Sequence, residues 1–332
     1  MKNIAINGMG RIGKLVVRRL FDVGLGENLI QLNDLNSDSE MHAHLLEFDT
    51  IHGKWEKNIK AESGKIIIDD IDLKFTSQQN KAEVNNGKID ILIDCTGTIK
   101  NSEDASHYFR SGIEEVLISA PVKDENARNI VYGVNHQIYK GAEKLVFTAA
   151  SCTTNCVAPI VKVLHEEIGI EHGSFTTIHN VTNTQKLVDK PAKDLRRARS
   201  ALNSLIPTTT GSATAISYIY PDLKGKLNGH SVRVPLLNAS LTDCVFELKR
   251  PATEKEVNDK FRRAAKNSLN GILGYEDRPL VSADYTSDPR SVVIDGPSTM
   301  IINGTQVKVF GWYDNEWGYA CRMVDIVKMM LK

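Results

Sequence analysis

The fold of this chain is decided near its N-terminus by the stretch Ile4-Ala5-Ile6-Asn7-Gly8-Met9-Gly10-Arg11-Ile12-Gly13. An apolar, β-branched run leads into three glycines spaced Gly-x-Gly-x-x-Gly, and a helical pattern continues from about Arg11 to Asp22. Gly8 suits a tight turn, Gly10 lets the backbone approach a pyrophosphate, and Gly13 allows close packing of the helix on the strand. A glycine-rich turn alone would explain the spacing, but the order of strand, turn and helix favours a dinucleotide-binding unit.

An acidic residue stands where such a unit needs one. The second β-like run, Asn28 to Asp34, ends 34 − 13 = 21 residues after the third glycine. A carboxylate there accepts hydrogen bonds from the adenosine ribose hydroxyls and repels a 2′-phosphate, which favours NAD over NADP. Taken alone, Asp34 is better explained as a turn residue, and only its distance from the glycines favours the binding role.

The first half of the chain alternates short apolar runs with helical segments. Because repetition of strand, helix and strand pairs the strands in parallel through right-handed crossovers, we expect an α/β fold with a Rossmann-type doubly wound parallel sheet. The segment 53–76 breaks this alternation and indicates an antiparallel insertion. The predicted strands are 2–7, 28–34, 89–95, 115–119 and 145–149, and the predicted helices are 11–22 and 103–111.

The pattern changes near Ser151, where we place a domain boundary. A helix from Cys152 to about Ile168 is followed by long amphipathic strands, which suggests an α+β second domain. Thr253 and Glu256 have the spacing of a capping box, in which each side chain bonds the other residue's backbone, and predict the start of another helix. The predicted strands are 173–181, 240–250 and 305–313, and a last helix covers 316–331.

Composition limits the classes of function. The chain has 332 residues, Lys+Arg 41 against Asp+Glu 41, a net charge of 0 and 41% apolar residues. These values are typical of a globular protein with about two domains, and the lack of a positive field argues against general binding to nucleic acid or membrane surfaces. No signal peptide or apolar run of about 20 residues is evident, so we expect a cytoplasmic protein.

One cysteine has the context of a nucleophile. Five cysteines form an odd, sparse set that argues for reduced thiols rather than disulfides. Cys152 lies between a strand end and a helix start, with Ser151 as a good N-cap, and the helix-terminal field is expected to lower the pKa of its thiol. The other four, which we expect to be small buried side chains, are Cys95, Cys156, Cys244 and Cys321.

A base and an anion site have weaker signals. His179 lies late in a long predicted strand, on one face with Phe175, Thr177 and Val181, and a satisfied sheet histidine is its more ordinary explanation. Arg233 lies between two valines in a β-like run, where its charge needs a partner such as a phosphate or carboxylate. A cluster at Arg196, Arg197 and Arg199 usually means a solvated face. No Cys-x-x-Cys or His-Glu-x-x-His pattern occurs, so we predict no metal.

Four motifs together resemble the phosphorylating glyceraldehyde-3-phosphate dehydrogenases over essentially the full length. They are Asn7-Gly8-Met9-Gly10-Arg11-Ile12-Gly13, Ser151-Cys152-Thr153-Thr154-Asn155-Cys156, Asp194-Leu195-Arg196-Arg197-Ala198-Arg199 and Trp312-Tyr313-Asp314-Asn315-Glu316-Trp317-Gly318-Tyr319. The resemblance implies an NAD-binding Rossmann domain over 1–150, joined by the C-terminal helix 316–332, and a catalytic α+β domain over 151–315. It also implies a cytoplasmic homotetramer in which the loop 185–199 reaches a neighbouring subunit's cofactor.

The resemblance assigns a reaction and roles. Cys152 would attack glyceraldehyde 3-phosphate, His179 would act as base while a hydride passes to NAD, and inorganic phosphate would release 1,3-bisphosphoglycerate from a thioester. Implied cofactor contacts are Gly8, Gly10, Arg11, Ile12, Gly13, Asp34, Thr96, Ser119 and Asn315. Implied substrate and phosphate contacts are Ser151, Thr153, Thr182, Arg197 (favoured over Arg196), Thr210, Gly211 and Arg233.

Departures from the family pattern leave alternatives open. Met9 replaces the usual Phe, Asn180-Val181 replaces the usual Ala-Tyr or Ser-Tyr after the histidine, and the stretch 76–80 lacks the usual charged, proline-containing sequence beside the adenine. The stretches 33–36, 42–49 and 236–246 look closest to a branch associated with arsenate resistance, in which arsenate replaces phosphate and 1-arseno-3-phosphoglycerate forms. Erythrose-4-phosphate dehydrogenase is a further alternative, and a binding protein that retains the fold without turnover is a third.

Overall fold

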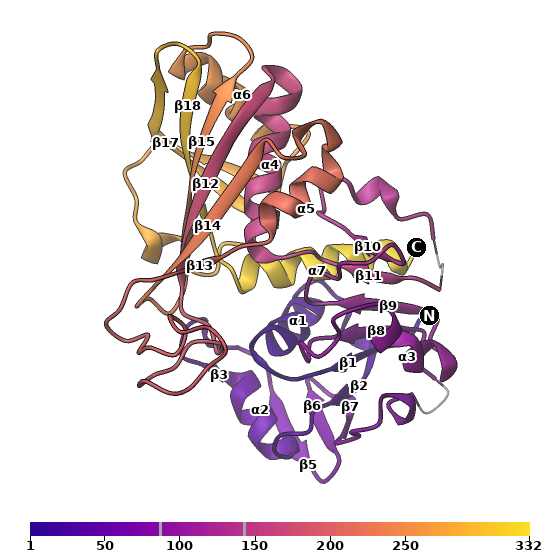
Figure 1. Ribbon diagram of the computed structural model, residues 1–332. Coiled ribbons are helices and arrows are strands. Elements are labelled where there is room, and N and C mark those ends of the chain that lie inside the picture. Colours follow the sequence, from indigo (N-terminus) through magenta and orange to yellow (C-terminus); the bar gives the residue numbers. More distant parts are fainter. Residues whose placement is uncertain (86–87, 142–143) are drawn as a thin grey trace. The chain divides into compact units, whose positions relative to one another are not determined.

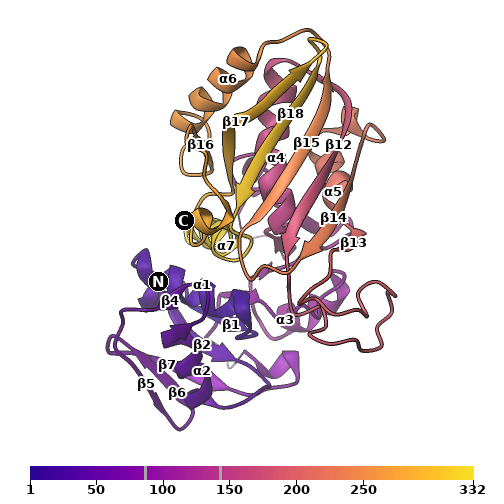
Figure 2. The same ribbon diagram turned by 90° about the vertical axis from the view of Figure 1, so that its left-hand side faces the viewer.

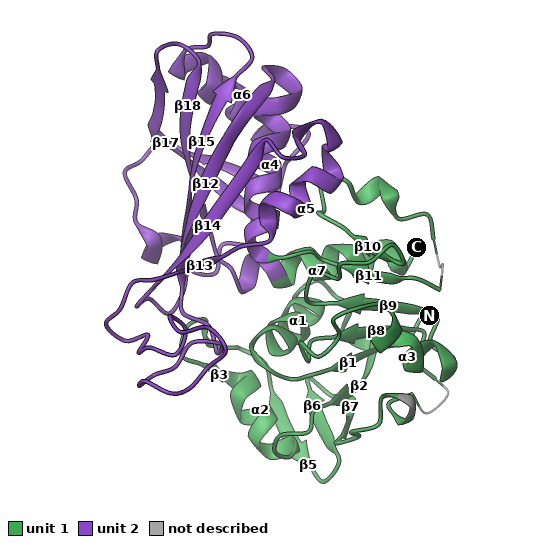
Figure 3. Ribbon diagram, in the orientation of Figure 1, with its two compact units in different colours: residues 1–151, 320–332 green, residues 152–319 purple. Residues whose placement is uncertain are grey.

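The computed structural model describes residues 1–85, 88–141 and 144–332. The chain divides into two compact units, which Figure 3 shows in different colours. Unit 1 comprises Met1–Ser151 and Ala320–Lys332, and unit 2 comprises Cys152–Tyr319. Each unit has its own large sheet.

Unit 1 contains a doubly wound, mostly parallel sheet. Its strand order is β10-β11-β9-β8-β1-β2-β7-β6-β5, and all neighbours from β10 to β7 pair in parallel (Figure 1). The order reverses between β1 and β8, the kind of switch point at which α/β sheets bind ligands. This confirms the predicted Rossmann-type fold. The parallel strands are β1 (Ile4–Asn7), β2 (Leu29–Asn33), β7 (Ile71–Thr76), β8 (Ile91–Asp94), β9 (Glu115–Ile118), β10 (Ala127–Asn129) and β11 (Val146–Thr148).

The predicted antiparallel insertion is present, with one refinement. Strand β5 (Ile59–Glu62) pairs antiparallel with β6 (Lys65–Ile68), and β6 pairs antiparallel with β7. Strand β7 also pairs in parallel with β2, so it belongs to both parts of the sheet. A separate two-stranded sheet joins β3 (Phe48–Asp49) to β4 (Gly53–Lys54).

The helices of unit 1 begin as local sequence dictates. Helix α1 (Arg11–Asp22) starts directly after the glycine turn and buries Leu15, Val16 and Leu20. Helix α2 (Ser39–Glu47) is capped by Asp38, whose carboxylate accepts a hydrogen bond from the Met41 backbone N–H. The segment predicted as one helix over 103–111 forms a 3₁₀ turn, Glu103–Ala105, followed by α3 (Ser106–Arg110). Helix α7 (Trp317–Met330) closes the chain.

Unit 2 is a seven-stranded, mainly antiparallel sheet with the order β13-β14-β12-β15-β18-β17-β16. Helices α4 (Cys152–Glu167), α5 (Ser212–Ile219) and α6 (Glu254–Lys266) gather on one face (Figure 2). Strand β15 alternates buried and partly exposed residues, because its side chains point in turn toward and away from that layer. The strands are β12 (Ile170–Asn180), β13 (Ile206–Thr209), β14 (Leu227–Val234), β15 (Ser240–Leu248), β16 (Leu273–Glu276), β17 (Val292–Ile302) and β18 (Gln306–Tyr313).

The start of helix α6 differs in one detail from the predicted capping box. The Thr253 hydroxyl caps α6 by accepting from the Glu256 backbone N–H, but the Glu256 carboxylate bonds Arg250 instead of completing the capping box. Arginine is the stronger partner because its hydrogen bonds to a carboxylate are charge-assisted. Within the described parts of the chain, no helix is long and apolar enough to cross a membrane.

Candidate active site

The three glycines of the N-terminal turn differ in what surrounds them. Gly8 has a φ of +96°, and an added Cβ would lie 2.7 Å from backbone atoms of Cys95 and Thr96. A Cβ at Gly13 would lie 2.0 Å from the Gly8 carbonyl oxygen, because the helix packs tightly on the turn. A Cβ at Gly10 would meet nothing within 4 Å. Gly10 therefore has the open backbone that a pyrophosphate needs.

Asp34 braces this turn. Its carboxylate accepts hydrogen bonds from the Met9 backbone N–H at 2.6 Å and from the Asn36 backbone N–H at 2.7 Å. The ammonium of Lys14 donates to the Met9 carbonyl oxygen at 2.5 Å, so both polar groups of the Met9 backbone are held by charged side chains. Burial lowers the pKa of Lys14, although Asp34 opposes this shift. The Asp34 carboxylate is thus preorganised at the end of β2.

The other predicted cofactor residues of unit 1 lie close to strand ends. The Thr96 hydroxyl donates to Asp94 at 2.7 Å just after β8, and the Ser119 backbone N–H donates to the Asp94 carbonyl oxygen at 2.9 Å just after β9. Arg11 begins α1 and pairs with Asp49, while Ile12 is partly exposed. Burial would raise the pKa of Asp49, but hydrogen bonds from Arg11 and from two backbone amides hold it at about 2.

In unit 2 the predicted nucleophile and base are in contact. Cys152 is the first residue of α4, and its Sγ lies 3.5 Å from His179 Nε2. His179 is buried on the same face of β12 as Phe175 and Thr177, as the period of two predicts. Its Nδ1 lies 2.8 Å from the Asn180 carbonyl oxygen. In the tautomer that carries its proton on Nδ1, the Nε2 lone pair faces the thiol. This is the geometry of a thiol beside its general base.

Arg233 lies directly across the sheet from the base. His179 and Arg233 are partners in the parallel register of β12 and β14, and Arg233 Nη1 lies 2.5 Å from His179 Nδ1 and 3.1 Å from the Asn180 carbonyl oxygen. Its Nε is buried and has no hydrogen-bond partner in the described structure. A partly buried guanidinium with an unpaired Nε–H suits an anion, as its place between valines suggested.

The electrostatics of this group depart from one prediction. Burial raises the pKa of Cys152, although the positive charge of Arg233 and hydrogen bonds with Thr153 oppose the shift. The predicted lowering of this pKa is therefore wrong for this structure, because loss of solvation outweighs the favourable field at the helix start. Burial, together with Arg233, lowers the pKa of His179 to about 3. At neutral pH the imidazole is therefore uncharged.

The residues predicted to bind phosphate fall into three groups. Thr153 bonds the Tyr313 hydroxyl at 3.1 Å, and Tyr313 bonds Thr177 at 2.7 Å. The Thr154 and Thr210 hydroxyls each bond Ser212 at 3.1 Å, which ties the start of α4 to the Thr210-Gly211 turn before α5.

The third group contains Arg197 and Thr182, which have separate local contacts. Arg197 donates twice to the Thr208 hydroxyl, at 2.9 and 2.8 Å, and its charge helps burial to lower the pKa of Arg233. Thr182 bonds Gln185 and Thr184 within its own turn.

Asn315 is buried and belongs to a network that the sequence did not reveal. Ser240 Oγ donates to Asn315 Oδ1 at 3.1 Å and accepts from the Asn180 backbone N–H at 3.3 Å. Ser240 begins a strand that was predicted correctly, but no pattern singles out one serine there. Tyr313 lies within a quoted motif, and its contact with Thr153 depends on tertiary packing alone.

The predictions on the other cysteines and on metal binding can be compared with the structure. All five cysteines are free; Cys156, Cys244 and Cys321 are buried as expected, whereas Cys95 is partly exposed, contrary to expectation, because it follows the end of β8. Among the described residues, no group of three or more His, Cys, Asp or Glu side chains could hold a metal ion.

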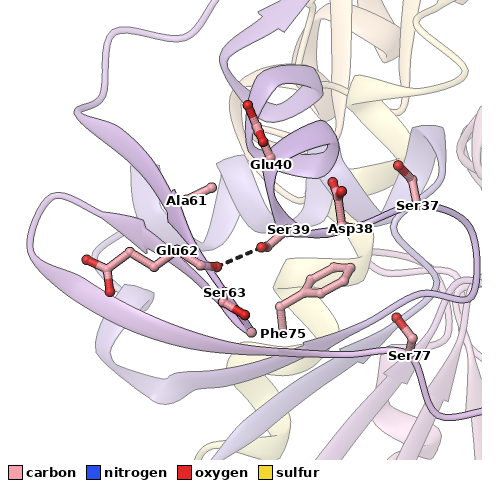
Figure 4. A pocket seen from close by; sticks show the side chains of 10 residues that line it. Ser37, Asp38, Ser39, Glu40, Ala61, Glu62, Ser63, Phe75 and Ser77 are labelled. Carbon is pink, nitrogen blue, oxygen red and sulfur yellow. Dashed lines mark hydrogen bonds between the residues drawn. The ribbon is translucent and has the colours of Figure 1, made fainter.

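Unit 1 has an open hollow of about 510 Å³ (Figure 4). None of the residues that line it is a predicted site residue. Its walls include Asp38, Glu40 and Glu62, and the Ser39 hydroxyl within it donates to the Glu62 carbonyl oxygen at 2.7 Å. Its acidic rim does not suit an anionic cofactor.

Comparisons with known proteins agree over nearly the whole chain. Residues 2–102 match the model of the glyceraldehyde 3-phosphate dehydrogenase NAD binding domain, and residues 151–315 match that of its C-terminal domain. The chain belongs to the glyceraldehyde-3-phosphate dehydrogenase family. It is 52% identical to glyceraldehyde-3-phosphate dehydrogenase 3 of Nostoc sp., covering 98% of this chain and 97% of that protein.

Two further relatives of the dehydrogenase family support the assignment. Glyceraldehyde-3-phosphate dehydrogenase 2 of Bacillus subtilis is 45% identical, with 98% of this chain and 95% of the relative covered. Glyceraldehyde-3-phosphate dehydrogenase 2 of Streptomyces avermitilis is 46% identical, with 97% and 96% covered. The family resemblance seen in the four motifs is thus confirmed.

Proposed function

We propose that this protein catalyses the NAD-dependent, phosphorylating oxidation of D-glyceraldehyde 3-phosphate to 1,3-bisphosphoglycerate. The observation that carries the proposal is the 3.5 Å contact between Cys152 Sγ and His179 Nε2, with Arg233 beside the same imidazole. A thiol, a neutral base and a nearby cation are the three groups needed to oxidise a phosphorylated aldehyde through a covalent intermediate.

The chemistry follows from these side chains. His179 Nε2 accepts the Cys152 thiol proton, the sulfur attacks the aldehyde carbon, and the imidazolium returns the proton to the former carbonyl oxygen. The product is a neutral hemithioacetal, and His179 is again uncharged. NAD supplies the hydride acceptor. As the hydride leaves, His179 takes the hydroxyl proton, and a thioester remains on Cys152. A phosphate oxygen then attacks the thioester carbon and the carbon–sulfur bond breaks. The acyl phosphate is released, and Cys152 remains on the protein as a thiolate that takes back the proton from His179.

Unit 1 suits the cofactor. The open backbone at Gly10 and the braced carboxylate of Asp34 fit a pyrophosphate and an adenosine ribose, and the carboxylate favours NAD over NADP. We assign Asn315 to the nicotinamide carboxamide. The further proposed cofactor contacts are Gly8, Arg11, Ile12, Gly13, Thr96 and Ser119.

Unit 2 suits two anions. Arg233, Arg197 and Thr182 would hold the phosphate of the substrate, with Arg197 preferred because its guanidinium is placed near Arg233 by β13 and β14. The attacking inorganic phosphate would contact Ser151, Thr153, Thr210 and Gly211. These assignments place the NAD-binding domain at 1–150 with the helix 316–332, and the catalytic domain at 151–315.

We also propose a cytoplasmic homotetramer without nucleic-acid or membrane partners. The segment 186–205 exposes five large apolar side chains, and the partly exposed face of the unit 2 sheet carries a registered apolar row. Such surfaces favour contact with further protein chains. Five free thiols suit a reducing compartment. The segment side chains are Leu187, Val188, Leu195, Leu202 and Leu205, and the row is Val232, Ile178, Leu241 and Trp312.

The test is NADH formation from glyceraldehyde 3-phosphate and NAD, with phosphate, with arsenate and with neither. We expect oxyanion-dependent turnover that falls by about 10³-fold or more in Cys152→Ser. The named relatives do not favour a dedicated arsenate-dependent role or an erythrose-4-phosphate dehydrogenase. A preference for erythrose 4-phosphate in the same assay, or no turnover with either aldehyde, would overturn the proposal.

A further inference from the structure

The amide that we assign to nicotinamide binding is held by a short chain of buried groups. Ser240, Asn180 and Asn315 are 1%, 1% and 6% exposed. The Asn180 backbone N–H donates to Ser240 Oγ at 3.3 Å, and Ser240 Oγ donates to Asn315 Oδ1 at 3.1 Å. The serine hydroxyl has a single proton and two acceptors within reach, Asn315 Oδ1 at 3.1 Å and Asn180 Oδ1 at 3.4 Å, and the nearer one is Asn315.

The chain of groups fixes which way the Asn315 amide faces. Oδ1 is occupied as an acceptor from Ser240, so the other side of the amide presents Nδ2 as a donor. Without Ser240, the two ends of the amide would be free to exchange. The carboxamide oxygen of the nicotinamide needs a hydrogen-bond donor in a fixed direction. If the Asn315 amide could turn over, it would also present its own oxygen, which repels the carboxamide oxygen.

The backbone around Ser240 is itself held under strain. Ala239, the preceding residue, has a φ of +58°, a left-handed conformation that is unfavourable for a residue with a Cβ. The Asn180 side chain donates to the Leu237 carbonyl oxygen at 2.6 Å and so fixes the turn that leads into Ser240. Asn180 also follows the base His179, whose Nδ1 lies 2.8 Å from the Asn180 carbonyl oxygen. One residue thus connects the base to the amide.

We infer that Ser240 is a positioning residue that orients the Asn315 amide toward the nicotinamide carboxamide, and that Asn180 holds Ser240 in place. This inference rests on the proposed function, because it assumes that Asn315 meets the nicotinamide. It predicts that Ser240 controls how the nicotinamide ring is presented for hydride transfer, without touching substrate or cofactor.

The test compares two ligands that differ only in the nicotinamide. Calorimetry measures binding of NAD and of ADP-ribose, which lacks that ring, to the wild type, Ser240→Ala and a matched control, Ser231→Ala. The control removes a buried serine hydroxyl that has no hydrogen-bond partner in the described structure. We expect Ser240→Ala to weaken NAD binding about 5- to 10-fold and to leave ADP-ribose binding unchanged. Ser231→Ala should leave both unchanged.

A second readout is stereochemical. With aldehyde deuterated at C1, the wild type should place deuterium on one face of C4 in the NADH product. Ser240→Ala should place part of the deuterium on the other face, because the nicotinamide ring can turn over when its carboxamide is not anchored. A variant that is only less stable, with the amide still correctly oriented, would keep transfer to one face. The effect should vanish when Asn315→Ala is already present, and Ser240→Cys, which keeps the volume and a weak donor, should lie between wild type and Ser240→Ala.

The outcomes separate the two levels of the argument. If the wild type binds ADP-ribose but gains nothing from the nicotinamide, the proposed role of Asn315 and this inference both fall. Suppose instead that the wild type binds NAD more tightly than ADP-ribose, that Ser240→Ala shows the same difference in affinity, and that its deuterium goes to one face of C4. Then the inference alone is refuted. Should Ser240→Ala fail to fold, Ser240→Cys and Asn180→Ala carry the same comparison.

Discussion

At the scale of single residues, Arg233 governs the chemistry of both reacting groups. Its charge opposes the burial that raises the pKa of Cys152, and it adds to the burial that lowers the pKa of His179. The same charge therefore favours a thiolate and disfavours an imidazolium. The arginine that we propose for the substrate phosphate therefore also helps to keep the proposed base, His179, uncharged.

Replacing Arg233 by Gln should shift both groups in predictable directions. The pKa of the Cys152 thiol should rise further, and that of His179 should rise from about 3 toward its ordinary value. We expect labelling of Cys152 by iodoacetamide at pH 7 to slow, because a smaller fraction of the thiol is then ionised. The measurement is the labelling rate from pH 5 to 10. Arg199→Gln, which removes an exposed ion pair with Asp189, serves as the control; an unchanged profile for Arg233→Gln would refute the electrostatic account.

His179 should also make the protein sensitive to acid. Its pKa is about 3 in the folded state against an ordinary 6.5, so below pH 6.5 the unfolded state binds the proton first. The stability from this group is complete above pH 6.5 and falls by about 1.4 kcal/mol per pH unit toward pH 3. Urea unfolding of His179→Gln at pH 7.5, 5.5 and 4.5 should show a shallower decline than the wild type. Parallel declines would contradict this, and the exposed His107→Gln is the control.

At the scale of elements, local patterns predicted most of the fold and a smaller part of the site. Helix α1 matched its prediction at both ends because the glycine turn and the apolar spacing are encoded in adjacent residues. The pKa of Cys152 was predicted with the wrong sign because its burial depends on strands more than 20 residues away. The same reason hid the link from Asn180 through Ser240 to Asn315, since each pair is 60 or more residues apart.

The turn between β6 and β7 offers a direct test of backbone strain. Asp69 and Asp70 both have positive φ, at 46° and 69°, which a two-residue hairpin requires and which glycine adopts without strain. Asp69 accepts from the Asn58 backbone N–H, whereas Asp70 is exposed. Asp70→Gly should therefore stabilise the protein by about 0.5–1 kcal/mol, as measured by urea unfolding. Gly64→Ala, at a φ of +77°, should have the opposite sign, and destabilisation by Asp70→Gly would disprove the strain argument.

At the scale of the whole molecule, charge and apolar surface have separate consequences. A net charge of 0 is compatible with the proposed anionic ligands because the positive groups are local, with Arg233 beside His179 and Arg197 held by Thr208. The same neutrality removes long-range repulsion between copies of the chain. Exposed apolar side chains then decide whether copies associate, and the segment 186–205 concentrates them.

Two leucines of this segment should control assembly. Leu187 and Leu202 are 71% and 65% exposed, and both are tied to Ser200, whose hydroxyl donates to the Leu187 carbonyl oxygen and accepts from the Leu202 backbone N–H. The Ser200 hydroxyl fixes the backbone of both leucines, and their side chains gain little from the fold of one chain because both stay in water. Burial of such a pair against another copy would contribute about 1.5–3 kcal/mol per side chain, repeated at each symmetric contact.

Replacing both leucines by serine should therefore dissociate the assembly without unfolding the chain. Light scattering over a range of protein concentrations should give a mass of four chains for the wild type and a lower mass for Leu187→Ser/Leu202→Ser. The double variant should still unfold in urea in a cooperative transition, which would show that each chain remains folded. Asn203→Ser, an exposed polar change in the same segment, should remain tetrameric. A double variant that stays tetrameric would show that this segment is not part of the interface. A monomeric wild type would refute the proposed tetramer itself.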